Sequence, residues 1–330
     1  MDNLTHSLVG AVIGQAGLKK KTGLGMAALI IGANLPDVDA ACFLWLDGVE
    51  HLAFRRGITH GPIAWVLLPL LLAGALWWFD RWQARRGKRP EGRLPVHFGW
   101  LYALSFIGCL THPALDWLNV YGIRLLEPFS HRWFYGDVLF IIDVWLWAIL
   151  GIGLWLSLRQ EKRGRNWRRT AQIAGAVGLA YIGMNAAIAV KSENDALTFY
   201  DNYPGIDAIG SPVPLAIWKR EIIWYAPGSD VETASPVSGQ WTLASGLSKE
   251  MTSLQAKVVW IEDGADPPVS AVELAVGDRQ LAAFIFWSRT PFVECSSGGK
   301  ILVRDARYYD PRARDRFTVA MPDVECEPLP

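Results

Sequence analysis

Histidine and cysteine are scarce in this chain, and neither sign of charge is in excess. The 330 residues include six histidines and four cysteines, with no CxxC pair that would indicate a thiolate metal site. The 32 basic and 32 acidic residues give a formal net charge of zero, so no basic field argues for a nucleic-acid partner. No histidine follows His131, and we therefore expect no histidine-ligated metal in the chain beyond it.

Long apolar runs, in contrast, fill the first part of the chain. Hydrophobic residues make up 51% of the sequence, which contains 17 tryptophans. A helix needs roughly 17 or more apolar residues to cross about 30 Å of hydrocarbon. We predict an all-α polytopic membrane domain over residues 1–191, with about six hydrophobic helices, the first two short. The runs are 4–18, 23–35, 62–80, 98–115, 138–158 and 170–190.

Basic residues are divided unequally between the two sides of this predicted domain. Fifteen lie at Lys19-Lys20-Lys21 and in the loops 81–93 and 159–169, and the positive-inside rule makes that side cytoplasmic. The three lysines follow the first apolar segment, whereas a signal peptide has its positive charges before it, so we expect His6 to be retained. These features predict a multi-pass protein of the plasma (inner) membrane, with membrane lipids as partners. The other side carries Arg55, Arg56, Arg124 and Arg132.

After about residue 191 the sequence changes to short alternating runs separated by turn residues. These runs predict strands at 217–224, 257–260, 281–287 and 300–303. We therefore expect a small soluble, mainly-β domain over residues 192–330, on the periplasmic or exterior side. In an oxidising exterior its two cysteines, Cys295 and Cys326, are able to form a disulfide. Cys42 and Cys109 are expected to be buried thiols.

Histidines and aspartates recur at the predicted outer ends of the membrane helices. His112 and Asp116 are four residues apart, which places both side chains on one face of a helix. Burying such a pair in a membrane without a partner would be costly. Threading the chain through the membrane gathers six donors at one depth, and they suit a divalent metal, zinc or manganese, with Asp116 able to bridge two ions. The six are His6, Asp37, Asp39, His60, His112 and Asp116.

Three further residues are second-tier candidates for this site. His131 and Asp137 belong to the loop 117–137, which we expect to cover the outer ends of the helices. Asp143 is an ionisable residue near the outer end of a membrane segment, although an ion pair with an arginine would also explain it. Each single histidine or Pro-Asp-x-Asp motif also has a simpler interpretation, as an interfacial residue or a helix stop. Their joint placement favours a metal site.

The combined motifs resemble the YdjM-like family of membrane-bound, metal-dependent hydrolases over about residues 1–160. The family commonly has histidine before Arg-Gly, where this chain has Arg55, and Arg55 is therefore not assigned as a ligand. The motifs are Thr5-His6, Leu35-Pro36-Asp37-Val38-Asp39, Arg56-Gly57-Ile58-Thr59-His60, Thr111-His112-Pro113-Ala114-Leu115-Asp116, and Tyr121-Gly122 to Trp133.

The motif order is also similar to that of zinc-dependent phospholipase C and P1-type nucleases, which are all-helical phosphoesterases. That likeness implies that one zinc is held by His60, His112, Asp116 and one of Asp37 or Asp39. It implies that His6 and Asp116 help to hold a second zinc. The phosphoesterases use further histidines for a third metal, and this chain has only His131 left for that purpose.

These observations predict a metal-dependent hydrolase of a phosphoester in a lipid or lipid-linked substrate, at the outer membrane interface. Asp39 is the residue that we expect to accept a proton from the attacking water. One alternative is a non-enzymatic membrane protein with a structural metal and a β domain that binds a partner. Another is an ion or proton transporter, against which the absence of a large inverted repeat counts.

Overall fold

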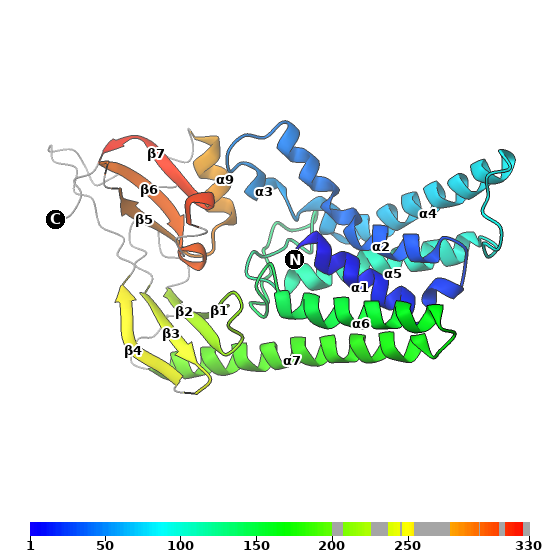
Figure 1. Ribbon diagram of the computed structural model, residues 1–330. Helices are drawn as coiled ribbons and strands as arrows, with labels where there is room; N and C mark the ends of the chain where they lie inside the picture. Colours follow the sequence, from blue (N-terminus) through cyan, green and yellow to red (C-terminus); the bar gives the residue numbers. More distant parts are fainter. Residues whose placement is uncertain are drawn as a thin grey trace. The chain divides into compact units, whose positions relative to one another are not determined.

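The computed structural model contains helices in its first part and antiparallel sheets in its last part (Figure 1). The chain forms two compact units, one of Met1–Ala40 and Arg56–Ala186, the other of Ala41–Arg55 and Ala187–Pro330. The stretch 41–55 thus groups with the C-terminal residues. The structure describes residues 1–199, 207–225, 237–244, 246–253, 278–296, 298–309 and 314–325.

Four helical stretches of the described residues are long and apolar enough to cross a membrane, so the predicted number of about six is not confirmed. They are Gly25–Leu44, Pro62–Arg85, Phe98–Trp117 and Trp167–Thr198. The helices are α1 (Asn3–Gln15), η1 (Leu18–Lys20), α2 (Gly25–Asn34), η2 (Leu35–Leu44), α3 (His51–Phe54), η3 (Ile58–His60), α4 (Pro62–Arg85), α5 (Phe98–Trp117), α6 (Val144–Lys162) and α7 (Trp167–Phe199).

Small residues allow α2 and α5 to pack closely. A Cβ atom added to Gly108 of α5 would lie 2.6 Å from the carbonyl oxygen of Leu29, and one added to Gly32 of α2 would lie 2.7 Å from that of Ser105. Glycine at such positions lets two helix backbones approach each other, as is common in membranes. Leu29 and Leu104 belong to a buried cluster that α4 completes. This packing places the end of α2 beside the last turns of α5.

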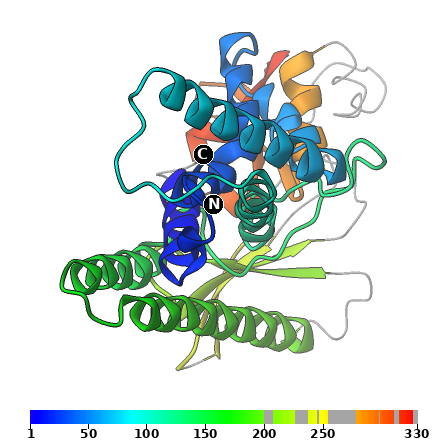
Figure 2. The ribbon, with the colours of Figure 1, turned by 90° about the vertical axis from the view of Figure 1, so that its right-hand side faces the viewer.

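Two further contacts fix the helices around the same end of this unit. Helices α6 and α7 run side by side as a hairpin (Figures 1 and 2), with the Tyr181 hydroxyl donating to Asp143 at 2.9 Å. Helix α1 is joined to α6 by the indole N–H of Trp147, which donates to the hydroxyl of Thr5 at 2.9 Å. Helix α6 begins at Val144, so the predicted run 138–158 is helical only after Asp143, which caps it.

The C-terminal unit contains two antiparallel sheets in the described residues. The first has the order β1-β2-β3-β4 and the second the order β5-β6-β7. The predicted strands at 217–224 and 300–303 correspond to β2 and β6, and 257–260 lies outside the described residues. The strands are β1 (Asp207–Pro212), β2 (Lys219–Tyr225), β3 (Val237–Thr242), β4 (Gly246–Ser253), β5 (Pro291–Cys295), β6 (Lys300–Asp305) and β7 (Thr318–Glu325), with η4 (Ala306–Tyr308) and η5 (Arg314–Arg316).

The prediction of a strand at 281–287 was wrong, because these residues belong to helix α9 (Arg279–Trp287). Asp278 caps the helix by accepting the N–H groups of Gln280 and Leu281, a typical N-terminal signal. Leu281, Phe284 and Trp287 recur every three residues and are buried, which is a helical period that the short apolar run concealed.

The described cysteines are of two kinds, buried thiols and a disulfide-bonded residue. Cys42 and Cys109 are buried and have no disulfide. Cys295, at the end of β5, is disulfide-bonded. Cys326, the partner predicted from the sequence, lies outside the described residues.

Candidate metal centre

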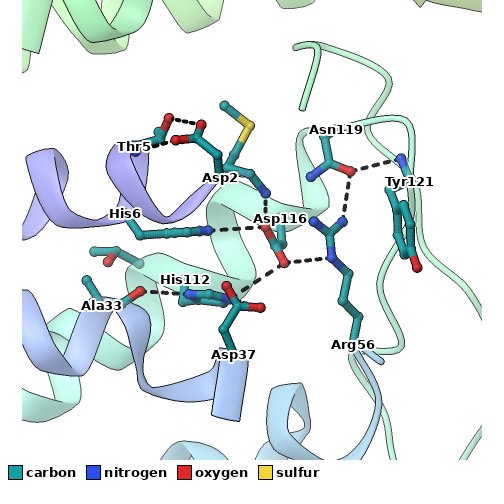
Figure 3. Close-up of polar contacts among 12 residues, drawn as sticks. Asp2, Thr5, His6, Ala33, Asp37, Arg56, His112, Asp116, Asn119 and Tyr121 are labelled. Atoms are coloured by element: carbon teal, nitrogen blue, oxygen red, sulfur yellow. Dashed lines mark hydrogen bonds and ion pairs between the residues drawn. The ribbon is translucent and has the colours of Figure 1, made fainter. Parts of the chain in front are cut away.

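Three imidazoles converge on the carboxylate of Asp116 in the last turn of α5. The Nε2 atom of His6 lies 3.3 Å from Oδ1 of Asp116. The Nε2 atoms of His60 and His112 each lie 3.6 Å from Oδ2. Figure 3 shows His6, from α1, and His112, from the preceding turn of α5, with their ring nitrogens directed at this carboxylate. All four side chains are buried.

The orientation of His112 is fixed by the end of α2. Its Nδ1 atom lies 2.7 Å from the carbonyl oxygen of Ala33, which can only accept, so Nδ1 carries the proton. Nε2 is therefore a lone-pair donor, and it faces Asp116 and also Oδ1 of Asp37, at 3.8 Å. The ring of His6 stacks on that of His112, with centroids 3.8 Å apart and an angle of 15°. The close packing of α2 on α5 thus sets the tautomer of His112.

His60 is held from the opposite edge of its ring. Its Nδ1 atom lies 2.9 Å from the hydroxyl of Thr59 and 3.6 Å from Oδ2 of Asp39. The 3₁₀ turn η3 ends at His60, and Pro62 occupies the first turn of α4. Asp39 therefore lies beside Nδ1 of His60, whereas Asp116 lies beside Nε2. A carboxylate behind a histidine is the usual way in which proteins orient a metal-binding imidazole.

Two groups of residues have ligand atoms close enough together to hold a metal ion. His60, His112 and Asp116 form one group, and His6, Asp37 and His112 form the other, with ligand atoms within 4.8 Å of one another in each. The Nε2 atom of His112 has one lone pair and serves one ion, whereas Asp116 offers an oxygen to each side. Among the described residues, Nε2 of His60 and Nε2 of His112 are buried without a hydrogen-bond partner. These buried nitrogens fit a divalent cation.

Arg56 is the main residue of this site that the sequence did not predict. Its Nε atom lies 3.0 Å from Oδ2 of Asp116. Its Nη1 atom donates to Oδ1 of Asn119 at 3.0 Å (Figure 3). The same atom donates to the carbonyl oxygen of Gly122 at 3.2 Å. Its guanidinium also lies over the ring of Tyr121. The sequence offers one indirect indication of such a residue: a buried carboxylate such as that of Asp116 needs a positively charged partner.

Other groups complete the surroundings of Asp116. The amino group of Met1 contacts Oδ1 (Figure 3). Asp37 differs from the other donors because 10% of its side chain is exposed, against 0–1% for His6, His112 and Asp116. Asp37 is therefore the most accessible of these side chains from outside the protein.

The structure does not bring the second-tier residues into either metal-binding group. His131 is largely exposed, and its Nδ1 atom lies 2.8 Å from Glu127, which also pairs with Arg124. Asp137 is buried and has a left-handed backbone with φ of 53°. Asp143 caps α6 by accepting the N–H of Leu146 at 2.8 Å, and it also accepts the Tyr181 hydroxyl. Asp143 thus has a structural role as the cap of α6. The described contacts of its carboxylate do not include the ion pair with an arginine that the sequence left open.

One comparison with known proteins places the helical part of the chain in a family of inner membrane proteins. The family model described as YdjM inner membrane protein matches residues 1–191, which include every residue of the metal-binding groups. The chain therefore belongs to the YdjM inner membrane protein family, as the motifs indicated. Neither the comparison with curated proteins nor that with solved structures finds a match.

Proposed function

We propose that this protein is a membrane-bound, metal-dependent hydrolase that cleaves a phosphoester in a lipid or lipid-linked substrate. The observation that carries the proposal is the convergence of three buried imidazoles on the two oxygens of Asp116. Imidazole nitrogen and carboxylate oxygen suit zinc, and also manganese. A bound divalent ion lowers the pKa of a coordinated water to about 7 and polarises a phosphoryl oxygen.

The candidate ligands form two overlapping sets. His60, His112 and Asp116 would hold one ion, and His6, Asp37 and His112 would hold another. Because Nε2 of His112 has one lone pair, it would serve only one of the two ions. The carboxylate of Asp116, whose Oδ1 lies 3.3 Å from Nε2 of His6, would then supply a ligand to the other ion.

The remaining polar residues hold this arrangement in place. Arg56 balances the buried charge of Asp116 through an ion pair of its Nε with Oδ2. Asp39 accepts the N–H of Arg56 at 2.7 Å and lies behind His60. Asp39 is also the residue that the sequence predicted as the proton acceptor. The exposed edge at Asp37 is the route by which we expect a substrate to enter.

A lipid-like substrate follows from where the donors lie along the candidate spans. His112 and Asp116 are in the last turns of Phe98–Trp117, and Asp37 is in the second half of Gly25–Leu44. Donors at the ends of spanning segments lie at the depth of lipid headgroups. The basic loops 81–93 and 159–169 follow the opposite ends of the helices, which favours a centre that faces the periplasm or exterior.

The test is metal analysis and phosphoesterase activity of the detergent-purified protein beside two variants. We expect the wild type to hold one or two equivalents of zinc or manganese and to hydrolyse phosphodiester or phospholipid substrates. The His60→Ala/His112→Ala variant should lose both the metal and the activity. His131→Ala removes an exposed histidine that pairs with Glu127, and it should behave as the wild type does.

Two results would contradict the proposal. One is a folded wild-type protein that takes up no metal even when zinc and manganese are offered. The other is a double variant that keeps the metal and activity of the wild type. Retention of metal with no hydrolysis of any phosphoester, and no exchangeable water on the ion, would instead indicate a structural site.

A further inference from the structure

The segment 41–55 lies, in the sequence, between two sets of residues of the metal centre. Asp37 and Asp39 precede it, and Arg56 and His60 follow it. The segment belongs to the same compact unit as residues 187–330, whereas its neighbours on both sides belong to the helical unit. A piece of the C-terminal unit is therefore joined covalently, at each end, to residues that build the metal centre.

The two ends of this segment are held together at the metal centre. Oδ2 of Asp39 accepts the N–H of Arg56 at 2.7 Å and the hydroxyl of Thr59 at 3.3 Å. Arg56 has φ of 55°, a left-handed conformation that is strained for a residue with a side chain. Such a conformation persists only where the surroundings enforce it. The surroundings of Arg56 include the carboxylate of Asp39, at the other end of the segment.

Gln280 of α9 binds the backbone at the middle of the segment. Its Oε1 atom accepts the N–H of Val49 at 2.6 Å, and its Nε2 atom donates to the carbonyl oxygen of Asp47 at 3.0 Å. Gly48 lies between these two groups with φ of 50°, and a Cβ atom there would collide with the Gln280 amide. One side chain therefore recognises both backbone groups around a turn that requires glycine.

Helix α9 makes Gln280 a rigid point of attachment. Asp278 caps the helix by accepting the N–H of Gln280 at 2.7 Å, and Leu281 and Trp287 bury its other face. The neighbouring ion pair of Arg279 with Glu50, at 3.1 Å, contributes little because 82% of the Arg279 side chain is exposed. Among the described contacts, Gln280 thus makes the hydrogen-bonded attachment of the segment to α9.

From these contacts we infer that the C-terminal unit positions the metal centre, and that Gln280 is the positioning residue through which it does so. By holding residues 47–49, Gln280 fixes the segment whose ends carry Asp39 and Arg56. This role rests on the proposed metal site. It gives a function to a part of the chain that lies beyond the family match over residues 1–191.

The test compares Gln280→Ala with Tyr309→Phe in the full-length protein. Tyr309→Phe removes a hydroxyl that donates to Glu294 at 2.9 Å within the same unit, so it serves as a control for the loss of a hydrogen bond that does not involve Gln280. We would measure amide hydrogen exchange at Arg56, and zinc affinity by competition with a chelator. Gln280→Ala should speed exchange at Arg56 and weaken zinc binding roughly two- to tenfold, the effect of about one hydrogen bond. Tyr309→Phe should change neither.

The native thiols show whether a variant has merely unfolded. Cys42 lies in the segment and Cys109 in α5, and both are buried. Release of the segment alone should speed maleimide labelling of Cys42 and leave Cys109 unchanged. Unchanged exchange at Arg56 in Gln280→Ala, or faster exchange with unchanged zinc affinity, would overturn the inference. A wild type that binds no zinc would refute the proposed function instead, and exchange at Arg56 would still decide the role of Gln280.

Discussion

The guanidinium of Arg56 and the carboxylate of Asp116 form a buried ion pair, with Nε 3.0 Å from Oδ2, at the point where the three imidazoles meet. This pair gives Asp116 a positive partner that does not depend on a metal. The stability of the metal-free protein and its response to metal are therefore linked through Arg56.

Substitution of Arg56 by glutamine should destabilise the protein more without metal than with it. Breaking a buried ion pair from one side costs about 3 kcal/mol, because the other charge is left unbalanced. A bound divalent ion would restore the balance at Asp116, so the metal-induced rise in Tm should be larger in Arg56→Gln than in the wild type. Thermal unfolding in detergent, with chelator and with zinc, measures both quantities.

Arg55→Gln is the matched control, because it removes the same charge one residue earlier. The Arg55 guanidinium lies over the ring of Phe43, 5.6 Å from its centroid, and belongs to the other unit. We expect its response to zinc to stay close to that of the wild type, because Arg55 lies outside both metal-binding groups. Equal metal-free stability of Arg56→Gln and the wild type would show that Asp116 does not need this partner.

Substitution of Asp39 by asparagine separates two roles that the sequence and the structure suggest for it. The contact of Asp39 with Nδ1 of His60 predicts an orienting role, and loss of such a carboxylate typically weakens metal binding by about 10- to 100-fold. We expect Asp39→Asn to show this loss of affinity, measured by chelator competition. Unchanged affinity with a large fall in kcat at saturating metal would instead assign the proton-accepting role to Asp39.

The sequence predicted the donors better than it predicted what surrounds them. His6, Asp37, His60, His112 and Asp116 could be grouped because membrane topology alone brings the ends of alternate helices to one depth. Arg56 was missed because charge counting treats an arginine outside the spans as a topology signal. Its left-handed backbone, which brings it to Asp116, depends on tertiary contacts that no local pattern encodes.

The wrong strand prediction and the contacts that the sequence did not reveal have identifiable physical causes. The run 281–287 was predicted as a strand because a short apolar stretch is ambiguous between strand and helix. The capping residue Asp278 is the local feature that indicates a helix there. The hydrogen bond that Asp143 accepts from the hydroxyl of Tyr181 joins residues 38 positions apart, and the sequence alone did not reveal it. The attachment of 41–55 to α9 involves residues more than 200 positions apart, which a single sequence does not reveal.

Gly108 tests the packing that sets the tautomer of His112. A Cβ atom at Gly108 would lie 2.6 Å from the carbonyl oxygen of Leu29, so Gly108→Ala should force α2 and α5 apart. The bond from Nδ1 of His112 to the carbonyl oxygen of Ala33 should then lengthen, and metal affinity should fall. We expect a loss of about 1–3 kcal/mol in stability, as for other overpacked interiors.

Gly99→Ala in the same helix is the matched control for that change. No atom lies within 4 Å of a Cβ built at Gly99, so the substitution adds only helix propensity, worth up to about 1 kcal/mol. Its metal affinity should equal that of the wild type. Thermal unfolding and chelator competition on both variants would refute the close-packing argument if Gly108→Ala and Gly99→Ala behaved alike.

The pH dependence of the C-terminal unit should depend on Asp305. Burial alone would raise the pKa of Asp305, but the adjacent Arg307 guanidinium and the Ser288 hydroxyl outweigh burial and lower the pKa to about 2. A carboxyl group whose pKa is lowered by folding stabilises the folded state above its unfolded pKa of about 4, and this contribution is lost as the pH falls towards about 2. At pH 7 the contribution is about 2 kcal/mol.

Asp305→Asn should lose this contribution, and hydrogen exchange in β6, followed against pH, measures the loss. The difference in stability between Asp305→Asn and the wild type should shrink between about pH 4 and pH 2, because the wild-type carboxyl becomes protonated over that range. Asp315→Asn, at an exposed carboxylate 3.7 Å from Arg304, should show no such trend. A constant difference between Asp305→Asn and the wild type from pH 4 to pH 2 would show that ionisation of Asp305 does not contribute, since only an ionising group changes its contribution with pH.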